Sequence, residues 1–118
     1  MATLTAQPMN RGGLGPTYAS VTIGGDACPC GYGVFLHFKN TAGSGRQVQL
    51  NIPAGRVWEP GVVPAPVLFT VPATTGDRMV GPVDALTFAD PITGLCSITY
   101  PAGADAALTV AVVQLVQP

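Results

Sequence analysis

Apolar and polar residues alternate along several short stretches of the chain, and such alternation predicts β-strands. The clearest stretch is 33–53, GVFLHFKNTAGSGRQVQLNIP. Successive side chains of a strand point to opposite faces, so each arm of this stretch has one apolar and one mostly polar face. The residues between the arms include two glycines, which favour chain reversal. We therefore predict a β-hairpin whose core positions are Val34, Leu36 and Phe38 in one arm and Val48, Leu50 and Ile52 in the other.

Shorter stretches elsewhere repeat this pattern between glycine and proline turns. They predict strands near 18–23, 67–71, 78–80 and 95–100. The segment ACPCGYG at 27–33 is predicted to be a loop that leads into the hairpin, and 54–67 a long surface loop. Residues 106–117 fit both a helical and a strand period. Because five of them are β-branched, and such residues lose rotamer freedom in a helix, we predict a strand with both faces covered.

Fifteen glycines and twelve prolines are spread so evenly that few segments have room for two helical turns. The chain is therefore predicted to be all-β. Its 118 residues suit a single-domain antiparallel β-sandwich of jelly-roll or Ig-like type. The glycine-rich residues 1–17 are predicted to form an extended N-terminal arm and 18–118 the sandwich. That arm is either a disordered tail or a segment that becomes ordered on a neighbouring subunit.

Charged residues make up only 9% of the chain and the net charge is −1, which argues against nucleic acid or an anionic membrane as a partner. Hydrophobic residues make up 47%, so we expect neighbouring molecules to cover part of the surface. No apolar run reaches the length of a membrane span, and the N-terminus lacks the pattern of a secretory signal. The chain is expected to be made in the cytosol.

The chain offers few groups for catalysis: one histidine, one glutamate and five scattered aspartates. His37 falls on the wetter face of its predicted strand, so we expect an exposed surface histidine, no cofactor and no enzymatic activity. A buried His37 in contact with two acidic side chains would favour an enzyme. Cys28, Cys30 and Cys96 are expected to be free thiols; a zinc site formed by these three and His37 is the weaker alternative, because C-x-C lacks a second short-spaced pair.

Three motifs follow one another in a fixed order: FLHFKN at 35–40, FTVPA at 69–73 with GDRMVGP at 76–82, and SITY at 97–100. With the closing apolar run 108–115, they resemble a family of short virion structural proteins of tailed bacteriophages of actinobacteria. The resemblance covers about 10–115 and departs from the family in the CPC loop and around Trp58. It implies a head decoration, or minor capsid, protein made in the host cytoplasm that binds and stabilises the outside of the icosahedral capsid.

The partner implied by this resemblance is the major capsid protein, and a homo-oligomer is expected, with a trimer suiting the three-fold positions of a capsid. The arm and the 54–67 loop are the predicted contact surfaces. Because they carry few charges, attachment should depend only mildly on salt. The candidate contact residues are Leu4, Met9, Arg11, Leu14, Arg56, Trp58 and Glu59.

Two alternatives stay open at this point. One is a carbohydrate- or receptor-binding sandwich that uses Trp58, Tyr32 and Tyr100 as exposed stacking platforms. The other is a different station on the virion, in the tail or the connector.

Overall fold

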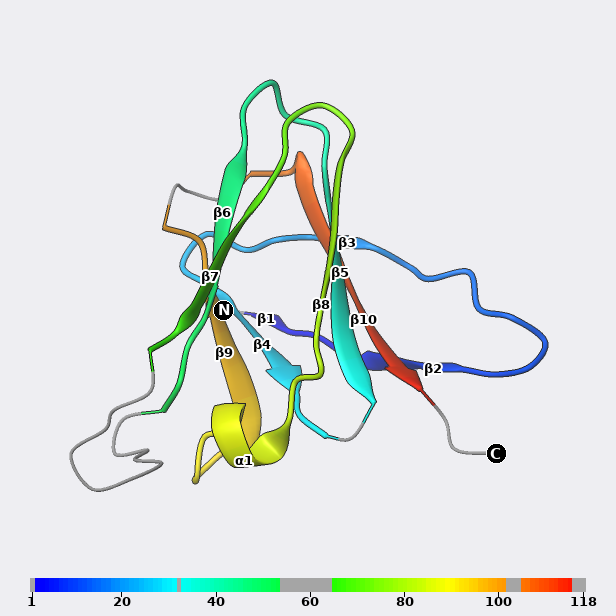
Figure 1. Cartoon of the computed structure of the whole chain (residues 1–118), viewed down its shortest axis with the longest axis vertical. Coiled ribbons are helices and arrows are strands. Elements are labelled where there is room, and N and C mark those ends of the chain that lie inside the picture. The colour runs from blue at the N-terminus through cyan, green and yellow to red at the C-terminus, as the bar shows by residue number, and fades with distance from the viewer. Residues whose placement is uncertain (1, 32, 54–64, 102–104, 116–118) are drawn as a thin grey trace.

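Two β-sheets pack against each other around one hydrophobic core, which confirms the predicted all-β sandwich (Figure 1). The computed structural model describes residues 2–31, 33–53, 65–101 and 105–115. Sheet A contains, in spatial order, β1 (Ala2–Thr3), β4 (Asp26–Pro29), β9 (Leu95–Thr99), β6 (Arg46–Leu50) and β7 (Val67–Val71). Sheet B contains β2 (Ala6–Met9), β10 (Leu108–Leu115), β5 (Val34–Asn40) and β8 (Gly76–Val80), while β3 (Ala19–Ser20) also pairs with β10.

The two sheets are mixed, and the prediction of purely antiparallel sheets is wrong at the N-terminus. β1 runs parallel to β4 in sheet A, and β2 runs parallel to β10 in sheet B. No hairpin turn precedes these strands, so nothing local forces them to run antiparallel to their neighbours. Between them, the amide of Leu4 donates a hydrogen bond of 2.7 Å to the carbonyl of Ala27. Residues 2–9 of the predicted arm therefore pair with this chain's own sheets.

The predicted hairpin over 33–53 is wrong, although its alternation is right. β5 pairs with β10 and β8 in sheet B, whereas β6 pairs with β7 and β9 in sheet A. The chain between them crosses from one sheet to the other, so the apolar faces of the two arms meet across the core. Asn40 stabilises this crossing: its buried amide donates to the carbonyls of Ser44, Val71 and Pro72.

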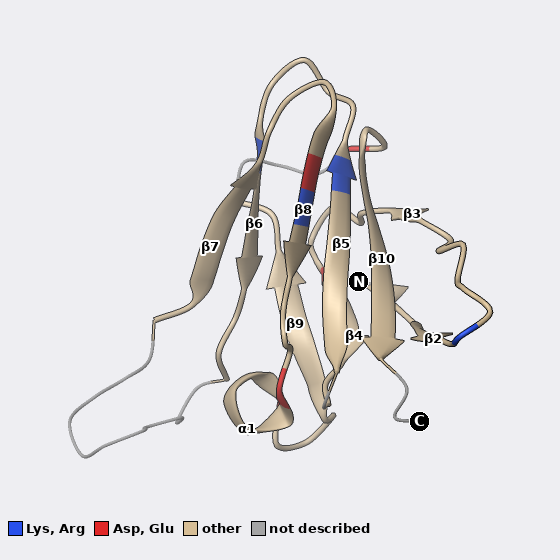
Figure 2. Cartoon of the chain, turned by 45° about the vertical axis from the view of Figure 1, so that its right-hand side comes forward, with Lys and Arg blue, Asp and Glu red and all other residues tan. Residues whose placement is uncertain are grey.

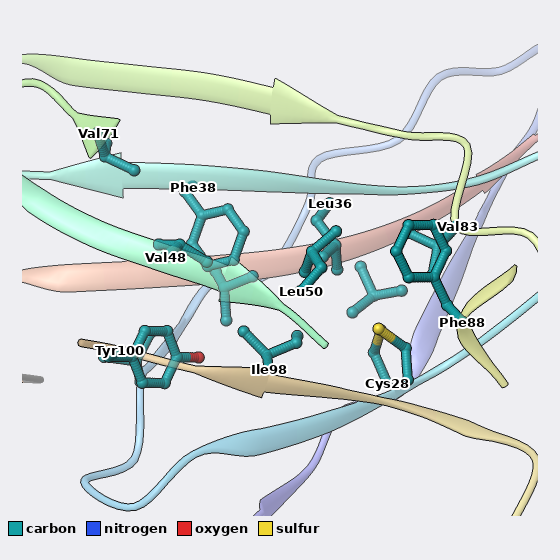
Figure 3. Close-up of a cluster of buried hydrophobic side chains, with 14 of the residues drawn as sticks. Cys28, Leu36, Phe38, Val48, Leu50, Val71, Val83, Phe88, Ile98 and Tyr100 are labelled. Carbon is teal, nitrogen blue, oxygen red and sulfur yellow. The ribbon is translucent and has the colours of Figure 1, made fainter. Parts of the chain in front are cut away.

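The core lies between the inner faces of the two sheets (Figure 3). Phe38, Val48 and Ile98 are fully buried there, as the alternation predicts. The ring of Phe38 meets that of Phe69 edge to face at 5.7 Å between centroids. Each large apolar side chain buried in this way contributes about 1.5–3 kcal/mol to folding, so this double layer is the main source of stability.

The last predicted strand is confirmed as β10, and both of its faces are covered because Val110, Ala111, Val112 and Val113 are all buried. The prediction of a loop at 27–33 is wrong in its first half, where β4 pairs with both β1 and β9.

The described residues contain one helix, α1 (Ala85–Phe88), which Asp84 caps by accepting a hydrogen bond from the amide of Thr87. None of the described helical structure is long and apolar enough to cross a membrane.

Candidate functional site

The outer face of sheet B carries two groups of side chains that could have a function, one apolar and one polar. On a strand, residues that alternate with core positions point away from the core. On β5 the core positions are Val34, Leu36 and Phe38, so the outer positions are Phe35, His37 and Lys39. The strand register places residues of β8 and β10 beside them on the same face, namely Asp77, Met79, Thr109, Ala111 and Val113.

One end of this face forms an apolar groove of about 320 Å³. Met79 is 66% exposed and Leu115 is 50% exposed, and both line it. Large apolar side chains grouped in this way on a surface mark interaction sites more often than isolated ones do. The lining residues are Gly33, Val34, Phe35, Met79, Val80, Gly81, Pro82 and Leu115, and we call this feature the apolar groove.

The other end of the face holds a hydrogen-bonded cluster of Tyr18, His37 and Asp77. The Tyr18 hydroxyl lies 2.5 Å from Nδ1 of His37, and Nε2 of His37 contacts Oδ1 of Asp77. The Tyr18 ring meets the imidazole edge to face at 5.4 Å, and Nζ of Lys39 lies 4.6 Å from the Tyr18 ring centroid. Tyr18 stands just before β3, so this cluster holds the chain entering β3 against the outer face of β5.

The partners of His37 define what it can do chemically. Because Asp77 accepts, Nε2 carries the proton, and Nδ1 of a neutral ring then accepts from the Tyr18 hydroxyl. Both ring nitrogens are therefore occupied within the protein. The expectation of an exposed His37 is wrong, since Tyr18 covers it and leaves it 8% exposed. It contacts one carboxylate and a phenol rather than the two acidic side chains that would favour catalysis.

Sheet A differs in that the titratable groups on and beside β4 and β9 face inward. The Tyr100 hydroxyl donates a 2.5 Å hydrogen bond to Oδ2 of Asp26, which also accepts from the amide of Thr22. Burial, followed by this hydrogen bond to Asp26, raises the pKa of Tyr100. Oδ1 of Asp26 is buried and has no partner among the described residues. Tyr100 is thus a buried, tethered residue, and its predicted use as an exposed stacking platform is wrong.

The cysteines also lie on the sheet A side of the core. Cys28 and Cys96 are directly opposite each other on β4 and β9, and both are fully buried. The contact with Cys96 and burial raise the pKa of Cys28, and burial raises that of Cys30 to about 11. All three are free thiols. His37 lies on the outer face of the other sheet, so the four residues of the alternative zinc site do not converge.

The predicted contact residues are distributed over three kinds of position. Leu4 packs against the core, so its first role is structural. Met9 ends β2 opposite Leu115, which places it beside the apolar groove. Arg11 is exposed and Leu14 half-buried in the loop that follows. The contact candidates Arg56, Trp58 and Glu59 lie outside the described residues, and so does Tyr32, the predicted stacking platform.

Neither the apolar groove nor the Tyr18 cluster was predicted from the sequence. The alternation did place Phe35 and His37 on the outer face, which was the available signal. It could not show that Tyr18, 19 residues earlier, and Asp77, 40 residues later, come to meet His37. Comparison of the chain with protein-family models, with curated proteins and with solved structures gave no match.

Proposed function

We propose that the protein is a bacteriophage head decoration protein, which binds the outside of the capsid lattice and stabilises it. The observation that carries this proposal is the apolar groove on the outer face of sheet B. It supplies a surface suited to adhesion on a chain with few charges. The resemblance of the sequence motifs to phage structural proteins supplies the partner, the major capsid protein.

The groove is suited to adhesion because a paired sheet holds its walls in place. Phe35 and Leu115 stand on β5 and β10, which pair along seven residues, and Met79 stands on β8, paired to β5. A partner that covers these side chains removes apolar surface from water without ordering a flexible loop first, and this reduces the entropic cost of binding. Met9 extends the surface at the end of β2.

A single groove is small compared with a stable protein interface, which buries about 800 Å² on each partner. A capsid compensates by repeating the site. Copies linked through contacts with one another or through a second site on the lattice gain avidity, because each later contact forms at a high effective concentration. A bound protein that spans neighbouring capsid subunits then opposes their separation, since it binds the assembled state and not the separated one.

The test is binding of the purified protein to capsids that lack it, followed by co-sedimentation. The double variant Met79→Asp/Leu115→Asp places two carboxylates in the groove, and we expect at least a ~30-fold loss of affinity from the lost apolar contact and the cost of burying charge. Attachment of the unmodified protein should change little between low and moderate salt.

The matched control is Leu86→Asp/Ile92→Asp. These residues are 78% and 94% exposed and lie in and just after α1, outside the groove. The control carries the same two substitutions of an apolar residue by a carboxylate, so it should bind like the unmodified protein. Equal binding by the groove variant and the control would contradict the proposal.

A further inference from the structure

Both sheets have open edges, and these edges differ in how well they are protected. Unpaired edge strands invite pairing with other chains, and proteins usually block them by shortness, proline or charge. Among the described strands, β1 and β3 have two residues each, β2 contains Pro8, and β8 carries Asp77 and Arg78. β7, with the sequence VLFTV, has five residues and none of these protections.

Among the residues that the structure describes, β7 has a strand partner on one side only. One side of it pairs with β6 from Val67 to Val71, and no other described strand pairs with its second side. Val67 is 38% exposed and Leu68 is 54% exposed. Figure 2 shows β7 at the margin of the molecule and free of charge, whereas β8 bears adjacent acidic and basic bands.

We propose that β7 pairs antiparallel with β7 of a second copy of this chain, about a two-fold axis at Phe69. The two copies of sheet A then form one continuous sheet. In this register Phe69 lies opposite itself, Leu68 opposite Thr70 and Val67 opposite Val71. Residues opposite each other in an antiparallel pair share a face, so the apolar inner faces of both copies stay aligned.

A second copy fits this edge better than an unrelated strand for two reasons. The strand carries no charge, so no like charges meet when it faces itself. Pro66 and Pro72 bound β7, and in the proposed register each lies opposite the other. Proline cannot donate a ladder hydrogen bond, so the paired region ends at the same place on both chains. The two-fold arrangement is closed, because both β7 edges are used once.

The test is the mass of the full chain in solution, measured by sedimentation equilibrium. The unmodified protein is expected at about twice its 12.0 kDa monomer mass at high concentration. Leu68→Lys/Thr70→Lys places lysines opposite each other across the axis, and at least a ~10-fold weaker association is expected from this repulsion. Both replaced side chains are exposed, so circular dichroism should show an intact fold.

Leu68→Lys/Thr70→Glu is the matched variant, because it changes the same two positions. In the proposed register the introduced lysine of each copy faces the introduced glutamate of the other, so this variant should associate like the unmodified protein. The amides of β7 that point away from β6 should exchange slowly with solvent in both associating forms and quickly in the double-lysine form.

A monomeric or trimeric mass for the unmodified protein would overturn the inference, since two-fold pairing of β7 in isolation gives a dimer. Equal association of the two charged variants would overturn it as well, because the register would then be wrong. The inference is independent of capsid binding through sheet B, and its failure would leave that proposal standing.

Discussion

The two sheets of this sandwich place their chemistry on opposite sides. Sheet A turns Asp26, Cys28, Cys96 and Tyr100 into the core, while its outer face carries mostly uncharged polar side chains together with the exposed Leu68. On the strands β5 and β10, sheet B turns aliphatic residues, Phe38 and, at one end, Asn40 inward, while the outer face of the sheet carries the apolar groove and the Tyr18 cluster.

The outer face of sheet A is also largely satisfied by its own hydrogen bonds. Nδ2 of Asn51 donates to the carbonyl of Ser97 and to the hydroxyl of Thr99, both at 3.2 Å, and its Oδ1 accepts from Gln49 at 2.8 Å. A partner would have to replace these bonds to gain contact. The apolar groove on sheet B requires no such exchange. This difference supports the proposal that the outer face of sheet B, and not that of sheet A, is the adhesive surface.

The largest change in the free energy of unfolding is expected at alkaline pH. It should come from the buried titratable groups on the sheet A side of the core. The pKa values of Cys28, Cys30 and Tyr100 are raised in the folded protein above their ordinary values, 9.0 for the thiols and 10.0 for the phenol. The hydrogen bond with Cys28 lowers the pKa of Cys96, which opposes the effect of Cys28, so Cys30 and Tyr100 carry the expectation. Groups with raised pKa values keep their stabilising contribution below the ordinary pKa and lose it as the pH rises. The free energy of unfolding should therefore fall above about pH 9, for Cys30 between 9.0 and about 11.

Urea denaturation from pH 7 to 11 measures this loss. Tyr100→Phe removes one of the three groups and should flatten the alkaline decline, although it should be less stable at pH 7 because Asp26 loses a buried donor. An alkaline decline as steep in Tyr100→Phe as in the unmodified protein would assign the loss to other groups.

A smaller loss of stability is expected when the Tyr18 cluster on the outer face of sheet B is disrupted. His37→Ala removes both side-chain hydrogen bonds of the imidazole and its contact with the Tyr18 ring, so the free energy of unfolding should fall by about 2 kcal/mol. Tyr18→Phe keeps the ring contact and removes one hydrogen bond, and should cost about 1 kcal/mol. If His37→Ala costs less than about 0.5 kcal/mol in urea denaturation, the cluster is not what holds the chain before β3.

The smallest effect is expected on the outer face of sheet A. Asn51→Ala removes several hydrogen bonds, but its partners are only partly buried and water can replace the amide, so a loss of about 1 kcal/mol is expected. Gln47→Ala, in β6 a few residues before Asn51, should change stability by less than about 0.5 kcal/mol. Thermal denaturation of both variants checks this order, and a loss for Asn51→Ala equal to that for His37→Ala would remove the contrast between the faces.

The sequence was informative wherever the deciding interaction was local. Alternation identified the inner faces of β5, β6 and β9, because the two-residue period belongs to the strand itself. β-branched residues correctly distinguished β10 from a helix. The sequence pattern did not predict β4, because it contains Pro29 and proline is rare inside strands. Proline is tolerated there because the paired residues of β1 lie opposite only Asp26 and Ala27.

The sequence pattern could not show which strands pair with each other. The alternation of 33–53 fits two arms side by side in one sheet as well as two arms facing each other across a core, and only the whole set of strands decides between them. The parallel pairing of β1 and β2 and the meeting of Tyr18, His37 and Asp77 likewise depend on contacts between distant segments. Of the predicted contact residues that the structure describes, Met9 alone was brought beside the apolar groove.

Image reconstruction of decorated phage heads tests the central claim most directly, because it shows which face of the sandwich meets the capsid. We predict that Met79 and Leu115 lie against the major capsid protein and that the outer face of sheet A, with Asn51 and Thr99, faces solvent. A reconstruction in which the outer face of sheet A meets the capsid, or in which heads carry no density for this protein, would contradict the account.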